Sequence, residues 1–282
     1  MSKILALVDG SIYADSVCGI AGWAALRTGL PVEVAHVIGR RMSSAFDLSG
    51  GLEPGQRSAL LEEYTRLDEQ HGKLAQQKGR ALLEAAKAAF DTAGVSKVET
   101  TLRRGDLLEA LADLEADAEI VVIGKRGEAA DFAKLHLGSN LERVVRSARM
   151  PVLVAARAYT PFDRFLIAFD GGKSANRAVD YVAASPLLKG MRCTILSVGA
   201  ETPENRSRLE APASLFRSAG FDVDAQLSNG EPEEVISAKI EAENIGLLVM
   251  GAYGHSRIRS LIIGSTTTEM VRRCKIPVLM FR

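Results

Sequence analysis

Gly246-Leu-Leu-Val-Met-Gly-Ala-Tyr-Gly254, followed by Gly264-Ser265 and Thr266-Thr-Thr-Glu-Met-Val-Arg-Arg273, decides how this chain folds. The unbroken apolar run before Gly251 is typical of a buried strand, and the segment after Ser265 predicts a helix. Glycines let backbone N–H groups approach an anion, and the N-terminus of a helix carries a partial positive charge. A strand, a glycine loop and a helix in this order therefore predict a phosphate-binding site.

The same pattern occurs a second time upstream. Gly124-Lys-Arg-Gly127 is followed, after ten residues, by Gly138-Ser139. Three longer segments also recur in the same order: residues 3–11, 118–124 and 140–154 match residues 164–172, 245–251 and 266–280. Self-similarity of this kind predicts two related domains. We place them at residues 1–157 and 162–282, with the linker at Arg157-Ala-Tyr-Thr-Pro161.

Short apolar runs alternate with helical patterns in each half, which predicts an α/β fold. In the second half we expect strands at about 164–169, 192–198, 222–227, 246–250 and 277–281, and helices at about 174–188, 204–219, 232–244 and 265–274. The strands show no polar alternation, which indicates a parallel sheet covered on both faces. Such doubly wound, Rossmann-like sheets bind ligands at the carboxyl ends of their strands, where both glycine loops would lie.

The composition of the chain excludes some kinds of partner and of binding site. The chain has 282 residues, 47% hydrophobic and 25% charged, with a formal net charge of +0, so neither nucleic acid nor a membrane surface is an expected partner. The apolar run in the first nine residues is too short, and too soon interrupted by Asp9, for a signal peptide. Three widely spaced cysteines without a CxxC pair fit a reducing, cytoplasmic location, and the histidines show no metal-ligand spacing, so we expect no metal site.

The first half carries a long insertion between residues 39 and 93. Gly50-Gly51-Leu-Glu-Pro54-Gly55 predicts an exposed loop. After it, residues of mostly apolar character recur at helical spacing: Leu60, Tyr64, Leu67, His71, Leu74, Lys78, Ala81, Ala85 and Ala89. They predict an amphipathic helix, with Gly72 and Gly79 as positions where it could bend. The favoured interpretation is a packing helix that extends past the sheet, and the alternative is an arm that binds a partner.

These residues resemble the universal stress protein family in its tandem form. The resemblance covers nearly the whole chain and rests on the aspartate after the first strand, the G-x2-G-x9-G-[ST] loop and the Pro-Val-Leu ending of each half. It implies a five-stranded parallel sheet of order 3-2-1-4-5 in each domain, with helices on both faces, and ATP at the carboxyl edge. In the second half it implies that Asp170 contacts the nucleoside and that the backbone near Val198 reads the adenine edge. The phosphates would lie at Gly251, Gly254, Gly264 and Ser265, with Thr266 next to them.

The first half departs from this pattern by one residue, since ten residues separate Gly127 from Gly138. The extra residue could shift the third glycine, so we expect the second half to be the main nucleotide site. The corresponding candidates in the first half are Asp9, Val37, Gly124, Gly127, Gly138 and Ser139. Each aspartate could instead simply cap its turn, and each serine could cap its helix.

Positive side chains in the glycine loops could neutralise phosphate charge. Arg257 could play this part in the second half, and Lys125 and Arg126 are its counterparts in the first. We find no convincing base to activate water and no acidic pair to hold Mg²⁺, so we expect slow ATP hydrolysis at most and no catalytic residue.

Three functions remain open on the sequence. The first is an ATP-binding stress-response regulator, with or without Mg²⁺. The second is a nucleotide-independent interaction protein, in which Pro151-Val-Leu-Val and Pro277-Val-Leu-Met pair the two domains within one chain, with a homodimer as a further step. The third is an ATP pyrophosphatase or adenylyl transferase, for which the loop at Asp170-Gly-Gly-Lys-Ser174 lacks the leading serine and the later aspartate.

Overall fold

The computed structural model describes residues 2–39, 54–128, 138–252 and 265–282. In the first half the strands are β1 (Lys3–Leu7), β2 (Val32–Gly39), β3 (Val98–Gly105), β4 (Ala118–Gly124) and β5 (Val152–Ala155). The helices between them are α1 (Ala14–Thr28), α2 (Pro54–Thr92), α3 (Leu107–Leu114) and α4 (Ser139–Ser147).

The second half repeats this order of elements. Its strands are β6 (Arg164–Ala168), β7 (Arg192–Val198), β8 (Asp222–Ser228), β9 (Leu247–Gly251) and β10 (Val278–Phe281). Its helices are α5 (Lys173–Ala184), α6 (Pro203–Ser218), α7 (Pro232–Ala242) and α8 (Ser265–Arg273). The strands and helices expected for this half are therefore present. The helix expected to run to residue 188 ends earlier, because Pro186 cannot continue it, and residues Pro186–Leu188 form a 3₁₀ turn.

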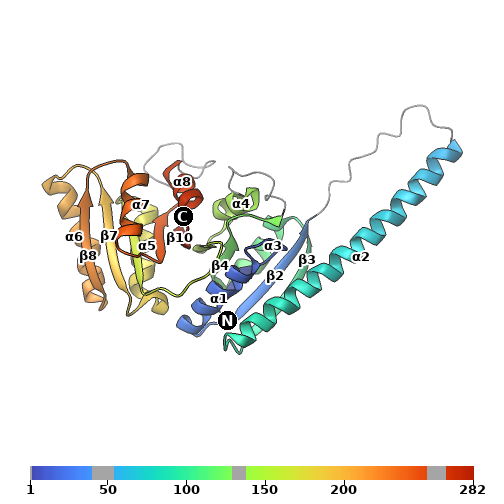
Figure 1. Cartoon of the computed structure of the whole chain (residues 1–282), viewed down its shortest axis with the longest axis horizontal. Coiled ribbons are helices and arrows are strands. Elements are labelled where there is room, and N and C mark those ends of the chain that lie inside the picture. Colours follow the sequence, from blue (N-terminus) through green and yellow to red (C-terminus); the bar gives the residue numbers. More distant parts are fainter. Residues whose placement is uncertain (1, 40–53, 129–137, 253–264) are drawn as a thin grey trace.

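All strands join one ten-stranded sheet of order β3-β2-β1-β4-β5-β10-β9-β6-β7-β8. Each half thus has the expected order 3-2-1-4-5, and every pairing within a half is parallel. The halves meet where β5 and β10 pair antiparallel, with Leu153 opposite Leu279 and Val154 opposite Val278. This confirms the predicted pairing of the two Pro-Val-Leu segments within one chain. Figure 1 shows the two halves side by side along this continuous sheet.

Two hydrophobic cores lie on opposite faces of the sheet. One is formed by α1, α2, α5 and α6, with Ala24, Phe90 and Phe216 fully buried in it. The other is formed by α3, α4, α7 and α8, with Leu111, Val144 and Met270 at its centre. Both cores continue across the junction between the halves, because the antiparallel pairing puts equivalent helices on the same face. Among the described residues, no helix is long and apolar enough to cross a membrane.

Helix α2 differs from the sequence expectation in two ways. It begins at Pro54, so Pro54 and Gly55 belong to the helix rather than to a loop, and proline is well suited to a first helical turn. The helix also continues through Gly72 and Gly79 without a break. A Cβ atom at Gly79 would lie only 2.7 Å from Leu102 Cδ1, so this glycine permits close packing on β3 rather than a bend.

Candidate functional site

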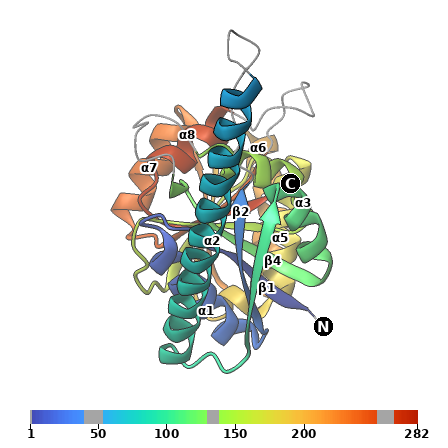
Figure 2. The same ribbon diagram turned by 90° about the vertical axis from the view of Figure 1, so that its right-hand side faces the viewer.

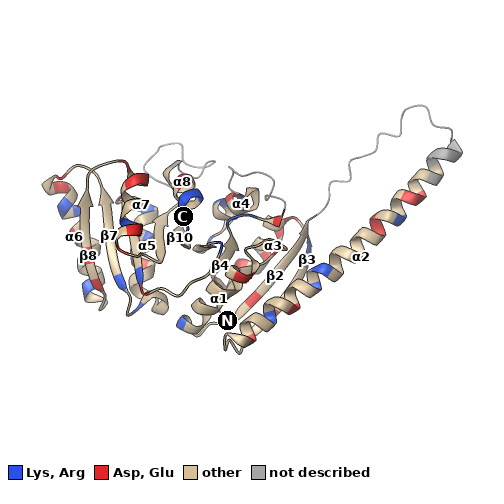
Figure 3. Ribbon diagram, in the orientation of Figure 1, with Lys and Arg blue, Asp and Glu red and all other residues tan. Residues whose placement is uncertain are grey.

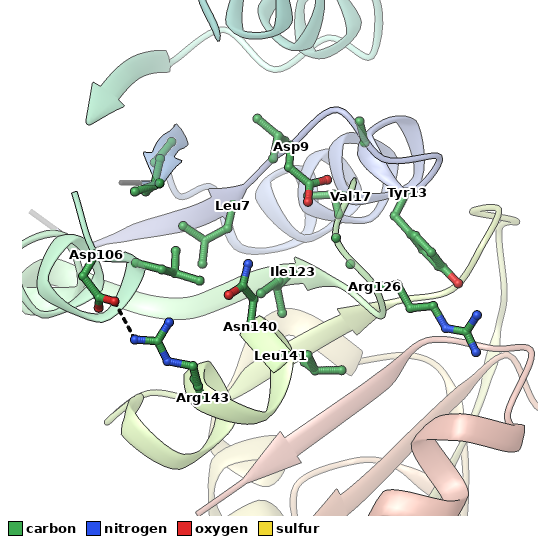
Figure 4. A pocket seen from close by; sticks show the side chains of 18 of the residues that line it. Leu7, Asp9, Tyr13, Val17, Asp106, Ile123, Arg126, Asn140, Leu141 and Arg143 are labelled. Carbon is green, nitrogen blue, oxygen red and sulfur yellow. Dashed lines mark hydrogen bonds and ion pairs between the residues drawn. The ribbon is translucent and has the colours of Figure 1, made fainter. Parts of the chain in front are cut away.

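A cavity of about 360 Å³ lies at the carboxyl edge of the strands in the first half. Five residues predicted from the sequence line it: Asp9, Val37, Gly124, Arg126 and Gly127. Its apolar wall includes Leu7, Val17, Ala35, Ile123 and Leu141. An apolar wall with a few convergent polar groups is the usual form of a small-molecule site. Figure 4 shows Asp9 and Asn140 pointing into this cavity from the end of β1 and from α4.

Asp9 is held by two backbone groups. Its Oδ1 accepts a hydrogen bond from the backbone N–H of Ser11 at 3.1 Å, and its Oδ2 accepts one from the N–H of Glu128 at 3.2 Å. A Cβ atom at Gly127 would lie 2.9 Å from the same Oδ2. Glycine at position 127 is therefore needed for the close approach of this carboxylate, and Asp9 both caps its turn and faces the cavity.

The glycines that end β4 and β9 have a structural reason of their own. A Cβ atom at Gly124 would lie 2.7 Å from Tyr13 Cβ, just before α1. A Cβ atom at Gly251 would lie 2.9 Å from Ser174 Cβ in α5. Both glycines thus let the start of the first helix in each half pack against the end of the fourth strand. Their recurrence is explained by packing, whether or not phosphate binds there.

The end of the first glycine loop lies next to its beginning. Gly138 is buried, and a Cβ atom there would lie 3.1 Å from Arg126 Cα, so the extra residue in the loop does not separate Gly138 from the first two glycines. Neither Gly138 nor Ser139, which begins α4, is among the residues that line the cavity, whereas Asn140 is. The sequence analysis missed Asn140, because a single polar residue inside a helix carries no motif.

Three charged side chains complete the cavity wall. Arg126 lines it, as expected, whereas Lys125 does not. Arg143 in α4 donates to Asp106 at 2.6 Å, and Asp106 also caps α3 by accepting from the N–H of Leu108 at 2.7 Å. The hydrogen bond from Arg143 is the main reason why the pKa of Asp106 is lowered. The sequence analysis named neither Arg143 nor Asp106, since they come together only when α3 and α4 pack.

The candidates of the second half are only partly described. Asp170 follows β6, and its Oδ1 accepts from the N–H of Gly172 at 2.8 Å, while Val198 ends β7. Thr266 is half-buried in α8, and the hydroxyl of the neighbouring Thr267 donates to the carbonyl of Gly251 at 3.1 Å. Gly254, Arg257 and Gly264 lie outside the described residues, as does the side chain of Ser265.

Known proteins resemble this chain along its whole length. The model of the universal stress protein family matches it twice, at residues 1–156 and 161–282. The chain belongs to the universal stress protein family. The universal stress protein Slr1230 of Synechocystis sp. is 37% identical over 287 residues, which cover 100% of each chain. A universal stress protein from Mycolicibacterium smegmatis is 23% identical, over 99% of this chain and 96% of the relative.

The crystal structure of a universal stress protein from Archaeoglobus fulgidus has the same fold. It superposes with a TM-score of 0.72 at 23% identity and covers 99% of this chain and 96% of its own. The family thus confirms two tandem universal stress protein units with a Rossmann-like α/β architecture. Within the described part of the chain, no group of three His, Cys, Asp or Glu side chains is placed to hold a metal ion.

Proposed function

We propose that this universal stress protein is an ATP-binding regulator of the stress response, with an adenine nucleotide at the carboxyl edge of its domains. The observation that carries the proposal is the cavity of about 360 Å³ in the first half. Adenine would lie against its apolar wall beside the backbone of Val37, and the ribose hydroxyls would donate to Asp9. Backbone N–H groups near Gly127, with Arg126 and Asn140, would face the phosphates.

The second half remains a proposed site on its sequence. Its loop has the nine-residue spacing of the family pattern, which the first half lacks. Asp170, Val198 and Gly251 lie at the carboxyl ends of β6, β7 and β9, as Asp9, Val37 and Gly124 lie at the carboxyl ends of β1, β2 and β4. We therefore propose two sites of different affinity, the stronger in the second half, within units at residues 1–157 and 162–282.

Binding rather than catalysis is the proposed role of ATP. The carboxylate of Asp106 is already paired with Arg143, and Asp9 accepts two backbone hydrogen bonds. Neither is placed as a base for water, so we expect hydrolysis to be slow and Mg²⁺ to be held mainly by the phosphates. The buried thiols of Cys18, Cys193 and Cys274 suit the cytoplasm, and a homodimer is the proposed assembly.

Calorimetric titration of nucleotide-stripped protein with ATP, with and without Mg²⁺, tests this function. We expect a stoichiometry near two, reduced to near one by either Asp9→Ala or Asp170→Ala. The two variants are matched controls, because each removes the same group from one half. A stoichiometry near one that only Asp170→Ala abolishes would restrict binding to the second half. If millimolar ATP gave no heat of binding and the purified protein carried no bound nucleotide, the proposal would be overturned.

A second function is favoured by one observation. Because Gly124 and Gly251 are required by helix packing, these two glycines by themselves are no evidence for a nucleotide. An interaction protein that needs no nucleotide is therefore the alternative. An Asp9→Ala, Asp170→Ala double variant that binds no ATP yet still complements loss of the protein under stress would support it.

A further inference from the structure

Helix α2 has an anchored half and an exposed half. Near its C-terminal end, Leu83, Ala86 and Phe90 are buried against the sheet. Every residue from Leu60 to His71 is exposed. Figures 1 and 2 show this N-terminal half projecting beyond the carboxyl edge of the sheet, and we call residues 58–74 the arm.

The arm exposes a concentration of large apolar side chains. Leu60, Leu61, Leu67 and Leu74 are exposed by 49%, 48%, 43% and 60%, and Tyr64 by 38%. Elsewhere in the described chain, exposed large hydrophobic residues are isolated: Ile12, Leu26 and Leu215 lie on or beside three different helices or turns. Isolated apolar residues on a surface are ordinary, whereas a contiguous apolar patch marks a site of interaction.

The spacing of these residues indicates what kind of partner they fit. Leu60, Tyr64, Leu67, His71 and Leu74 follow one another at intervals of four and three residues, which is the 3.5-residue repeat of a coiled coil. At about 100° per residue, this stripe lies roughly 120° around the helix from the face that packs on the sheet. The stripe is therefore available to a second helix while α2 keeps its place on the sheet.

Charge along α2 is divided in a way that suits an antiparallel partner. Residues 58–69 contain Glu62, Glu63, Asp68 and Glu69 against Arg66, a net charge of −3. Residues 70–80 contain Lys73, Lys78 and Arg80 and no acidic residue, a net charge of +3. Two copies of α2 side by side in opposite directions would place each acidic segment beside the basic segment of the other, whereas a parallel pair would place like charges together. Figure 3 shows these charges along α2.

The base of the arm offers room for the tip of another. A cavity of about 970 Å³ lies between α2 and the ends of β2 and β3. It continues the stripe, since His71, Leu74 and Lys78 line it, and Arg104 adds a second positive charge. Lys78 forms an ion pair with Glu128 there, and Asp68 also lines the cavity. A second arm that follows the stripe would bring Glu62 and Glu63 toward these positive side chains.

We propose that the arm is a dimerisation element, whose apolar stripe packs antiparallel against the arm of a second copy of this chain. The pairing is isologous, because each arm presents the same surface to the other. It does not use the junction of β5 with β10. The cavity at the base of the arm adjoins the nucleotide cavity, since Val37, Gly39 and Gly105 line both, but the pairing rests on the stripe and on the charges of α2 and requires no bound nucleotide.

Sedimentation velocity on the nucleotide-free full chain at tens of micromolar tests the proposal. We expect a dimer for the wild type and a monomer for Leu67→Glu, because a buried charge in the stripe is costly. Leu215→Glu on α6 is the matched control, since Leu215 is 40% exposed and lies outside the arm. It should remain dimeric. Unchanged circular dichroism and ATP binding of the Leu67→Glu variant separate loss of the dimer from misfolding and from failure of the nucleotide sites.

The direction of pairing is tested with Leu60→Cys, since the native cysteines Cys18, Cys193 and Cys274 are buried. In an antiparallel pair the two introduced thiols lie at opposite ends of the contact, so oxidation should leave the dimer non-covalent. Efficient formation of a disulfide-linked dimer would show a parallel pair and overturn the proposal. A monomeric wild type would also overturn the proposal, and the stripe would then be a binding surface for a different helical protein. A Leu67→Glu variant that stays dimeric would overturn it as well.

Discussion

The ammonium group of Lys125 donates a hydrogen bond to the backbone carbonyl of Cys274. Lys125 follows Gly124 in the glycine segment of the first half, and Cys274 caps the C-terminus of α8 in the second. The negative end of a helix favours a cation, so this contact joins the halves next to the strand junction. Lys125, which the sequence suggests as a phosphate ligand, therefore links the two halves of the protein instead.

The same contact gives a dependence of stability on pH. Burial, helped by the charge of Arg126 and opposed by Cys274, lowers the pKa of Lys125 from 10.5 to about 8. Because the unfolded chain binds this proton more tightly, stability rises with pH between about 8 and 10.5. Relative to Lys125→Met, the wild type should gain about 2 kcal/mol of unfolding free energy between pH 7 and pH 9.5. Urea unfolding of both proteins checks this, and parallel pH profiles would contradict it.

Asn140 and Ser139 offer a comparison within the first half. Asn140 lines the cavity and Ser139 does not, although the sequence pattern favours the serine. Asn140→Ala should weaken ATP binding to the first site by about tenfold, the value of one ordinary hydrogen bond. Ser139→Ala should change it by less than about twofold. Titrations with ATP in an Asp170→Ala background isolate the first site. If only Ser139→Ala weakened binding there, the serine of the family pattern, and not Asn140, would contact the nucleotide.

Gly246 anchors the segment that links the halves. A Cβ atom there would overlap Cβ of Phe162, whose ring lies 4.8 Å from that of Trp23 in α1. Gly246→Ala should therefore destabilise the protein by about 1–3 kcal/mol, because the linker must shift. Gly39→Ala is the control, since a Cβ at Gly39 meets nothing within 4 Å, and its unfolding free energy should change by less than about 0.5 kcal/mol. Urea unfolding measures both variants, and equal changes in the free energy of unfolding for Gly246→Ala and Gly39→Ala would contradict the packing argument.

The continuous sheet predicts that the halves unfold together. Leu279 in β10 is fully buried opposite Leu153 in β5. Leu279→Ala should cost about 2–5 kcal/mol and should lower the midpoint for both halves. Trp23 is the single tryptophan and lies in the first half, so its fluorescence reports that half while circular dichroism reports both. Coincident midpoints are expected. A shift in circular dichroism with unchanged Trp23 fluorescence would show that the halves unfold separately.

Several features follow from local sequence alone. The repeat of apolar runs predicts the five strands of each half, since a strand buried on both faces must be apolar throughout. Pro232 begins α7 and Gly220, with φ of +84°, ends α6, as their backbone preferences require. By contrast, the sequence around Pro54 predicts a loop, whereas Pro54 begins α2. Proline is common both in loops and in the first turn of a helix, so the residue alone does not decide between them.

The sequence by itself determined the class of this protein: a tandem α/β chain with an aspartate after the first strand and a glycine loop after the fourth in each half. These features are local, because a strand, a turn and a helix start depend on residues close together in the chain. Only the tertiary structure decided that Lys125 ties to Cys274, that Asn140 and Arg143 line the cavity, and that the leucines of the arm are exposed. Each of these depends on which elements pack together, and residues 37 to 149 positions apart in the chain meet only in the folded protein.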